Sequence, residues 1–443
     1  MQNLIVDVRL WDKEVGSMVW DKKRDVAIFE FEPKFLKLNL EIAPVIMPSD
    51  KAKGKNYYFP ENRNSCFKGL PGIFADSLPD KFGNQIISEW FANKVLNSRM
   101  INPLEGLCYI GKRGMGALEF DPSELLGKFE TSSLVNISEL TELARKALND
   151  KDGFRADLKN AQGSILDILK IGTSAGGAKP KAIIAFNPTT NEVRSGQVKA
   201  PEGFGYYLLK FDGVENSKIS DNPIGVGNIE YAYYKMAKDC GIDMMNSILL
   251  TDGGYSHFMT QRFDRSEEGE KIHTQTMAAI GHLDRDSPCS YEQGFQIMRK
   301  LNLPYLELEQ FFKRMVFNVM SRNHDDHTKN HSFLMNKNGK WRLAPAYDLC
   351  YSYSSTGQWP VQHHMSINGK RSNFEYSDLV SVAKNMGISN YDISIVQIAE
   401  VVSRWKQYAL DAGVQEMHIK QIENNHMLLR QTITQGRGNP FGI

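Results

Sequence analysis

The sequence lacks several features that would assign it to a familiar class of protein. Its five cysteines are scattered and odd in number, and no Cys-x-x-Cys pair suggests a zinc site, a redox site or a disulfide framework. No apolar run is long enough to span a membrane, and the first residues lack the basic and then apolar order of a signal peptide. The net charge of +1 gives no overall field that would favour nucleic acid. We therefore expect a cytoplasmic protein with reduced thiols and no membrane contact.

The composition is that of an ordinary globular protein, with 41% hydrophobic and 24% charged residues. A length of 443 residues suffices for about two or three domains. The sequence has no internal repeat and no low-complexity tract. Function must therefore be sought in local clusters of reactive side chains.

The densest such cluster occupies residues 322–333, Arg-Asn-His-Asp-Asp-His-Thr-Lys-Asn-His-Ser-Phe. A predicted helix over 306–322, with an apolar stripe at helical spacing, leads directly into it. Asp325 precedes Asn330 by five positions, the spacing at which protein kinases place the catalytic base and a magnesium-binding amide. Asp326 does not have this spacing. We predict that Asp325 accepts the proton of an attacking hydroxyl and that Asn330 ligates Mg²⁺.

A second metal ligand is expected at Asp348. Segments 331–335 and 340–343 have strand character, and the Asn-Gly pair at 338–339 favours a tight hairpin turn between them. Such a hairpin would return the chain to the catalytic loop and place Asp348 beside Asn330. Mg²⁺ is commonly held by a few carboxylates together with substrate phosphates, and this layout offers that set.

The same cluster has a second interpretation. His324, Asp325, His327 and His331 offer imidazole and carboxylate groups that suit a transition metal, as in metal-dependent phosphohydrolases. The two interpretations can be distinguished by the part of the chain before the loop, because the kinase interpretation requires a nucleotide-binding region there.

A glycine-rich stretch at 171–182, Ile-Gly-Thr-Ser-Ala-Gly-Gly-Ala-Lys-Pro-Lys-Ala, is a candidate phosphate loop before a predicted strand over 182–186. Glycines let the backbone approach a phosphate closely. The stretch is not a Walker A motif, because Ala178 stands where the lysine is required. A glycine-rich hairpin turn is the alternative, and Lys179 and Lys181 favour the phosphate interpretation.

The segments that follow have the order of a kinase N-lobe. Lys210 lies on a predicted apolar strand over 205–211, where an unpaired cation would be costly. Glu230, near the start of a predicted helix over 227–240, is the expected partner in the lysine–glutamate pair that kinases require. The alternative for Lys210 is an edge-strand lysine whose head reaches solvent. A strand over 256–263 then ends at the expected adenine-binding hinge.

Outside these motifs the patterns outline the remaining organisation. The N-terminal region is β-rich, with strands over 4–11 and 25–31 and a turn over 12–16. Residues 102–120 look glycine-rich and loop-like, with short strands. Helices are expected over 84–95, 137–148, 290–301, 374–386, 393–410 and 414–433. We divide the chain into an N-terminal subdomain (1–125), a kinase N-lobe with a connecting segment (126–264) and a helical C-lobe (265–443).

The order of these motifs resembles the HipA family of bacterial serine/threonine kinases, the toxin components of HipBA toxin–antitoxin modules. The resemblance covers essentially the whole chain. It is carried by Ser174-Ala-Gly-Gly-Ala-Lys-Pro-Lys181, Lys210 in its strand, Arg262-Phe263-Asp264-Arg265, Asp325-Asp-His-Thr-Lys-Asn330 and Tyr347-Asp348, with Leu78-Pro79-Asp80 similar to the family's N-terminal domain. It implies an α+β, two-lobed protein-kinase and phosphoinositide-kinase-like fold, with an extra N-terminal β-rich subdomain and an all-helical C-lobe.

The resemblance also implies roles for individual residues, with ATP and Mg²⁺ as cofactors. Asp325 is the catalytic base, Asn330 and Asp348 hold the metal, and Ser174 matches the serine that family members autophosphorylate to switch themselves off. The implied nucleotide contacts are Gly176, Gly177, Ala178, Lys179, Pro180, Lys181, Lys210, Gln261, Arg262, Phe263, His327 and Tyr347. The phosphate loop departs from the familiar family pattern, since Lys179-Pro180 stand where Gln-Glu is usual.

The expected activity is that of a serine/threonine protein kinase toxin that phosphorylates a translation-related protein such as an aminoacyl-tRNA synthetase. The implied partner is a HipB-like DNA-binding antitoxin dimer, so that DNA is reached only through the antitoxin. Three alternatives stay open: a small-molecule or lipid kinase of the same fold, a phosphohydrolase built on the 324–331 cluster, and a non-catalytic binding module.

Overall fold

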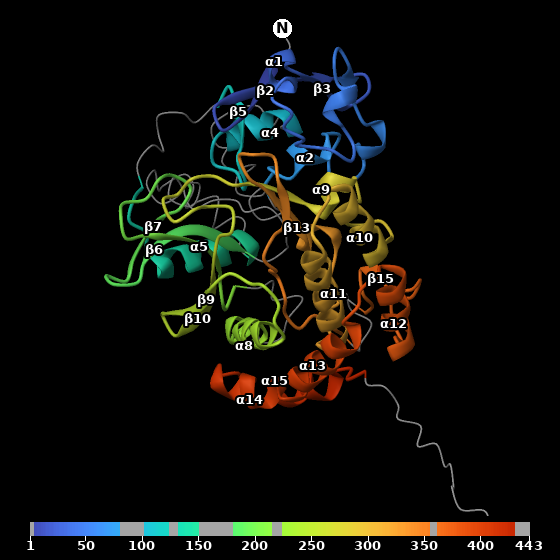
Figure 1. Cartoon of the computed structure of the whole chain (residues 1–443). Helices are drawn as coiled ribbons and strands as arrows, with labels where there is room; N and C mark the ends of the chain where they lie inside the picture. The colour runs from blue at the N-terminus through green and yellow to red at the C-terminus, as the bar shows by residue number, and fades with distance from the viewer. Residues whose placement is uncertain are drawn as a thin grey trace, which may run out of the picture.

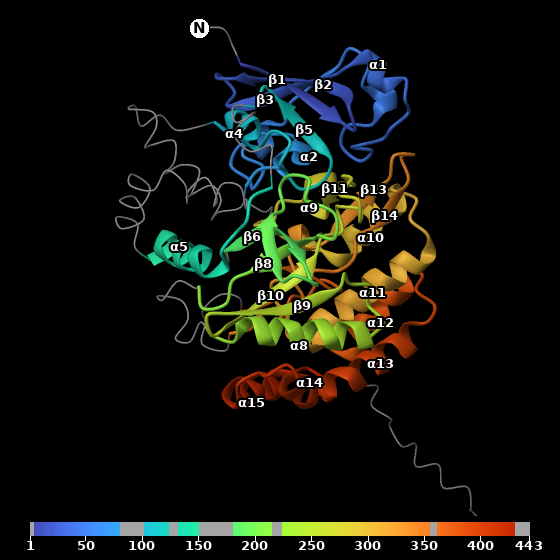
Figure 2. The ribbon, with the colours of Figure 1, turned by 90° about the vertical axis from the view of Figure 1, so that its left-hand side faces the viewer.

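The computed structural model describes residues 4–79, 102–123, 132–149, 180–214, 224–354 and 361–429. Two five-stranded sheets lie in the N-terminal and middle parts of the chain, and a mostly helical part follows them (Figures 1 and 2). Across these described ranges, no helix combines the length and apolarity needed to cross a membrane. The mixed α and β architecture expected from the sequence is confirmed.

The first sheet is antiparallel, with the strand order β4-β3-β2-β1-β5. Its strands are β1 (Ile5–Leu10), β2 (Lys13–Asp21), β3 (Val26–Phe31), β4 (Asn56–Tyr57) and β5 (Leu118–Asp121). Alternate residues of β1 (Val6, Val8 and Leu10) are buried, as expected for a sheet with one face on a core. The short helices around it are α1 (Pro33–Leu36), α2 (Gly72–Ala75) and α4 (Pro103–Ile110), with 3₁₀ turns η1 (Ser49–Lys51) and η2 (Pro60–Asn62).

The second sheet has the order β7-β6-β8-β10-β9 and is also antiparallel. Its strands are β6 (Lys181–Asn187), β7 (Glu192–Ser195), β8 (Gly205–Lys210), β9 (Ser247–Asp252) and β10 (Tyr255–Gln261). Helices α5 (Ile137–Asn149) and α8 (Val226–Asp239) lie beside this sheet. The register pairs Lys210 of β8 with Lys181 of β6 and with Phe258 of β10. Lys181 begins β6 and Lys210 ends β8, so the two lysines lie side by side at the same end of these antiparallel strands.

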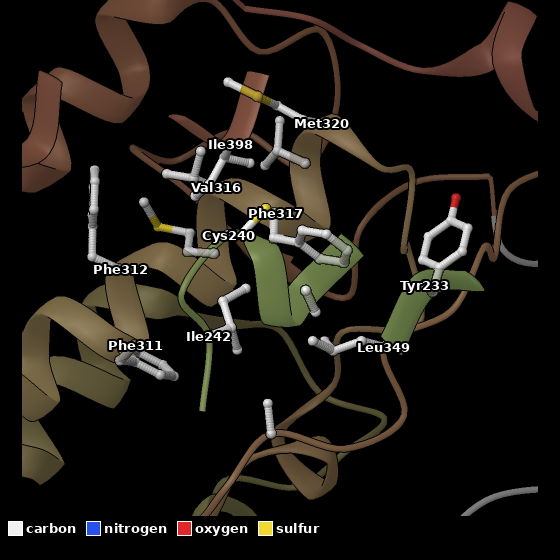
Figure 3. Close-up of a cluster of buried hydrophobic side chains, with 14 of the residues drawn as sticks. Tyr233, Cys240, Ile242, Phe311, Phe312, Val316, Phe317, Met320, Leu349 and Ile398 are labelled. Atoms are coloured by element: carbon white, nitrogen blue, oxygen red, sulfur yellow. The ribbon is translucent and has the colours of Figure 1, made fainter. Parts of the chain in front are cut away.

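The helical part is organised around α11, whose apolar stripe is confirmed. Its helices are α9 (Met277–Gly281), α10 (Tyr291–Lys300), α11 (Tyr305–Met320), α12 (Tyr376–Asn385), α13 (Tyr391–Ser403), α14 (Trp405–Asp411) and α15 (Glu416–Asn425). Phe311, Val316 and Phe317 of α11 are fully buried in one cluster with residues of α8 and α13. Figure 3 shows these side chains converging from several elements. This packing holds α11 rigid, and α11 ends where the catalytic loop begins.

Two small sheets accompany the helices, so the C-terminal part is not composed of helices alone. The first contains β11 (His273–Thr276), β13 (Ser332–Met335) and β14 (Trp341–Leu343), and the second pairs β12 (Cys289–Ser290) with β15 (Met365–Ser366). The hairpin predicted after the catalytic loop is confirmed as β13–β14. The Asn336 side chain accepts the Asn338 N–H at 3.0 Å, and Gly339 takes a φ of 77° in this turn.

Several predictions of local structure were wrong. Residues 13–16 begin β2, and the turn before them is made by Trp11 and Asp12, which take φ angles of 48° and 64°. Residues 103–110 form α4 rather than a loop, with Asn102 and Glu105 as a capping box. The helix expected over 393–410 is divided at Arg404, and the last described helix ends at Asn425. The helix expected over 84–95 lies outside the described residues.

Candidate active site

The catalytic loop follows α11 and is held by backbone hydrogen bonds to a distant segment. The His324 N–H donates to the Ser352 carbonyl at 3.0 Å, and the Ser352 N–H donates to the Arg322 carbonyl at 3.0 Å. The Asn330 side-chain nitrogen donates to the Asp325 carbonyl oxygen at 2.7 Å. Asn330 therefore stabilises the loop with its nitrogen, and its amide oxygen is the atom that can ligate a metal.

Neighbouring Asp325 and Asp326 have opposite environments. The Asp325 side chain is 47% exposed, whereas that of Asp326 is fully buried. Asp326 accepts hydrogen bonds of 2.8 Å from the Tyr291 hydroxyl, from His363 Nδ1 and from the His364 N–H. Burial alone would raise the pKa of Asp326, but His363 and these hydrogen bonds outweigh it and lower the pKa. Asp326 is a structural anchor, and Asp325 is the carboxylate that a substrate can reach.

Asp348 lies at the centre of a buried charge cluster with three other side chains. Lys210 Nζ bonds both Glu230 of α8 and Asp348 Oδ1, and Lys181 Nζ lies 3.8 Å from Asp348 Oδ2. Burial opposes the charged forms, but the opposite charges outweigh it. They raise the pKa of Lys210 and lower the pKa of Asp348. The predicted lysine–glutamate pair and the predicted metal ligand are thus brought together at one point.

Asp325 carries a raised pKa of about 6. Partial burial is the main cause, and the negative charge of Asp348 adds to it, while Arg285 and Lys181 act in the opposite direction. A general base works best when its pKa lies near the working pH. Asp325 therefore has the position and the basicity that proton acceptance from a hydroxyl requires.

This pKa gives a prediction of pH dependence. A base must be ionised to act, so kcat/KM for phosphate transfer should rise with pH and level off above about pH 6. Below that value, the rate should fall about tenfold per pH unit. A pH–rate profile from pH 4.5 to 8, with unfolding followed in parallel by circular dichroism, measures this. A rate that stays flat down to pH 4.5 in the folded protein would show that Asp325 is not the base.

A cleft of about 920 Å³, counting the space open to solvent at its mouth, lies beside the charge cluster. Lys181, Gln261, Arg262, Phe263, Tyr347 and Asp348 all line it. The Phe263 and Tyr347 rings are 5.5 Å apart, and the Tyr347 hydroxyl donates to the Lys329 carbonyl at 2.7 Å. A concave site with apolar walls and a few charged groups at one end suits a nucleotide.

The hinge segment is held in place by hydrogen bonds of its backbone and of Arg262. The backbone N–H groups of Gln261 and Arg262 are bonded to the carbonyls of Asn246 and Tyr206, both at 2.8 Å. The Arg262 guanidinium is buried and binds Asp264 through two hydrogen bonds of 2.8 and 2.7 Å. Arg262 therefore lines the cleft with its guanidinium paired to Asp264.

The transition-metal interpretation of the loop is not supported by its geometry. The His331 ring packs against Tyr291 and Phe311 in the core, at centroid distances of 5.7 and 5.1 Å. The His324 ring packs against His363 at 4.2 Å. Within the described part of the chain, no group of three or more His, Cys, Asp or Glu side chains is arranged to hold a metal ion. His324 and His331 are therefore packing groups.

His327 lies beside the candidate base. Its Nε2 is 3.8 Å from Asp325 Oδ1, and its buried ring lies 5.4 Å from that of His364. Burial lowers the pKa of His327 to about 3, with a smaller contribution from His364. His327 is therefore neutral at physiological pH.

Two groups near the site were not predicted. Asp76 of the N-terminal domain lines the cleft and accepts hydrogen bonds from the Thr276 N–H and Oγ1 at 2.6 and 2.9 Å. His364 Nε2 lies 3.6 Å from Asp325 Oδ1. Both come from segments far from the catalytic loop, and no local pattern marks them.

Of the predicted phosphate loop, only Pro180 and Lys181 lie within the described residues; Ser174, Gly176, Gly177, Ala178 and Lys179 do not.

The donor set fits a magnesium nucleotide. Carboxylates and an amide oxygen are the hard ligands that Mg²⁺ prefers, and Asp348 is held in its charged form. Lys181 and Lys210 place two ammonium groups at the end of the cleft, where phosphates would lie. Asn330 and Asp348 are thus the candidate metal ligands.

Comparison with known proteins gives the following matches. Residues 173–420 match the model of the HipA-like C-terminal domain, and residues 6–121 match that of the HipA N-terminal domain. A chain from the HipA, HipB and operator DNA complex of the Shewanella oneidensis MR-1 toxin–antitoxin system superimposes with a TM-score of 0.65. That likeness covers 95% of each chain at 16% sequence identity, and it shows that the two chains share a fold.

A curated protein of Haemophilus influenzae, named "Putative kinase", is 25% identical over 160 residues. The match covers 33% of the present chain and 45% of that protein, so the chain spans about half the length of this relative.

Proposed function

The chain belongs to the HipA family, and on that premise we propose that it is a magnesium- and ATP-dependent serine/threonine protein kinase that acts as a toxin. The observation that carries the proposal is the cluster in which Lys210 bonds Glu230 and Asp348, with Asp348 lining the cleft and close enough to Asp325 to raise the pKa of that carboxyl, while Asn330 binds the Asp325 carbonyl. These are the parts that phosphoryl transfer from ATP requires: a base, metal ligands and a cation for the phosphates.

The mechanism rests on positioning and electrostatics. Bound Mg²⁺, held by Asn330 and Asp348, would supply the positive charge that phosphoryl transfer needs. Lys210 is fixed by Glu230 at the end of the cleft, where it can neutralise phosphate oxygens. Asp325 is exposed and basic enough to orient a serine or threonine hydroxyl and to take its proton.

The biological setting follows from the family and is part of the proposal. The Shewanella structure contains HipB and operator DNA, so we propose a HipB-like antitoxin dimer as the partner of this chain, with DNA contacted through it. We propose a translation-related protein, such as an aminoacyl-tRNA synthetase, as the target. A cytoplasmic location and the division at residues 125 and 264 belong to the same proposal.

A panel of acceptors tests the substrate class. Wild-type protein is incubated with γ-labelled ATP and Mg²⁺ in a bacterial lysate, with small-molecule hydroxyl compounds, and with lipid vesicles. We expect label in a small number of lysate proteins, on serine or threonine. Label confined to a small molecule or a lipid would instead assign a kinase of another substrate class to the same fold.

We also predict that the protein phosphorylates itself on Ser174. The Ser174→Ala variant should then take up no phosphate while it retains transfer to an external acceptor. Peptide mapping by mass spectrometry measures this, with the nearby Thr173→Ala variant as a matched control that should still be phosphorylated. Phosphate that maps to another residue in the wild type would contradict the assignment.

A further inference from the structure

A second concave site, distinct from the nucleotide cleft, lies between the N-terminal domain and the second sheet. Three separate segments contribute to it: the connection from α4 to β5, the connection from β7 to β8, and the chain just after the hinge. Figure 2 shows β5 reaching from the N-terminal domain toward β6 and β11 in this region. The volume of this second site is about 690 Å³, including the part open to solvent. The charged residues that line this basic pocket are Lys112, Arg113, Lys199, Arg265, Lys271 and Glu119.

Each of the two innermost cations of the basic pocket is fixed in place by backbone carbonyls and one carboxylate, Glu119 for Lys271 and Asp264 for Arg265. Lys271 Nζ donates to Glu119 Oε1 at 2.7 Å and to the Lys112 carbonyl. Arg265 donates to the carbonyls of Gly114 and Gly116, each at 3.2 Å. Backbone carbonyls orient a cation without cancelling its charge. Among the residues that line the basic pocket, Glu119 is the carboxylate and five side chains are positive, of which Arg265 also binds Asp264 behind the lining.

Neighbouring positive charges contribute to lowered pKa values of the buried cations Lys271 and Arg265. Burial lowers the pKa of Lys271, and Arg265 and Arg262 lower it further despite Glu119. Burial and Arg262 lower the pKa of Arg265 to about 10. Like charges held in a concave, partly desolvated site repel one another, and a bound anion would relieve that repulsion.

The basic pocket is separated from the nucleotide cleft by Asp264. Arg262 lines the cleft and Arg265 lines the basic pocket, and both guanidinium groups bind the same buried carboxylate of Asp264. The Gly116 N–H of the N-terminal domain donates to Asp264 at 2.7 Å. The two sites thus share a wall, but their linings differ.

We propose that the basic pocket binds the phosphate group of a ligand other than the ATP substrate. Lysine and arginine in combination, held rigidly around a concave space, are the groups that recognise phosphate. A phosphorylated small molecule and a phosphoserine of a protein present the same chemistry, and both are tested below. The inference does not depend on the proposed kinase activity, because it concerns binding alone.

The test uses the two exposed lysines at the rim, because Arg265 and Lys271 also hold the fold together. The variant Lys112→Glu/Lys199→Glu reverses two charges of the basic pocket. The matched control Lys51→Glu/Lys53→Glu makes the same change at two exposed lysines elsewhere. Circular dichroism checks that both variants are folded. Isothermal titration calorimetry is then performed on the whole protein with inorganic pyrophosphate and with a phosphoserine peptide, in EDTA so that no metal supports binding in the cleft.

We expect saturable binding of at least one probe to the wild type, weakened at least tenfold in Lys112→Glu/Lys199→Glu and unchanged in the control. Lys210→Met, which removes a cation from the nucleotide cleft, should leave this binding intact. The probe that binds more tightly identifies the source of the phosphate. No saturable binding of either probe, equal affinity in the two charge-reversal variants, or loss of binding in Lys210→Met would overturn the proposal.

Discussion

Replacing Asp325 by Asn is expected to reduce phosphate transfer by about a thousandfold while the protein stays folded and retains its affinity for ATP. General base catalysis contributes roughly a hundredfold to ten-thousandfold in rate. Asn keeps the size of the side chain but cannot take a proton. Because the Asp325 side chain is 47% exposed and the loop is held through its backbone carbonyl, the substitution leaves the surrounding hydrogen bonds in place.

The measurement is single-turnover transfer from labelled ATP, with nucleotide affinity measured on the same sample. Transfer within tenfold of the wild-type rate would exclude Asp325 as the base. A fall in rate accompanied by an equal fall in ATP affinity would assign Asp325 to nucleotide binding rather than to proton transfer.

Replacing Asp326 by Ala is expected to destabilise the folded state by at least about 2 kcal/mol. The change would leave the buried Tyr291 hydroxyl and His363 Nδ1 without their acceptor, and the His364 N–H would keep only its longer bond of 3.3 Å to the His324 carbonyl. Each buried donor left without a partner costs about 1–3 kcal/mol. The segment around His363 would lose its shortest hydrogen bonds to the catalytic loop, so activity should fall together with stability.

The adjacent variant Asp325→Ala is the matched control, since it makes the same chemical change one residue earlier at a half-exposed position. Thermal unfolding of both variants should show a midpoint lowered by several degrees for Asp326→Ala and little changed for Asp325→Ala. Equal midpoints for the two variants would contradict the distinction between a structural and a catalytic carboxylate.

Much of the candidate site could be predicted because its residues lie within short, strongly patterned segments. The interval from Asp325 to Asn330 is local, and the hairpin after it is specified by its Asn-Gly turn. Lys210 stands out as a cation on an apolar strand, and Glu230 as a carboxylate on the next helix. The structure brings Lys210, Glu230 and Asp348 into direct contact. The long amphipathic helix α11 was equally clear, because many residues contribute to its periodicity.

The parts that were missed depend either on weak local signals or on contacts between distant segments. The capping box at Asn102 and Glu105 was a readable helix start that the nearby glycines obscured. The turn predicted over residues 12–16 lies instead at Trp11 and Asp12, where the φ angles are positive. Asp76 reaches the cleft across 200 residues, through its bonds to Thr276. No spacing rule predicts such a contact, because it arises only from how domains pack.

The central claim is that this chain transfers phosphate from ATP through the site at Asp325. Intact-mass spectrometry after incubation of the wild type and of Asp325→Asn with ATP and Mg²⁺, followed by peptide mapping, tests it most directly. We expect one added phosphate, on Ser174, in the wild type and none in the variant. Phosphate on both proteins would contradict the role of Asp325, and a wild type that takes up no phosphate and binds no ATP would contradict the assignment of a kinase.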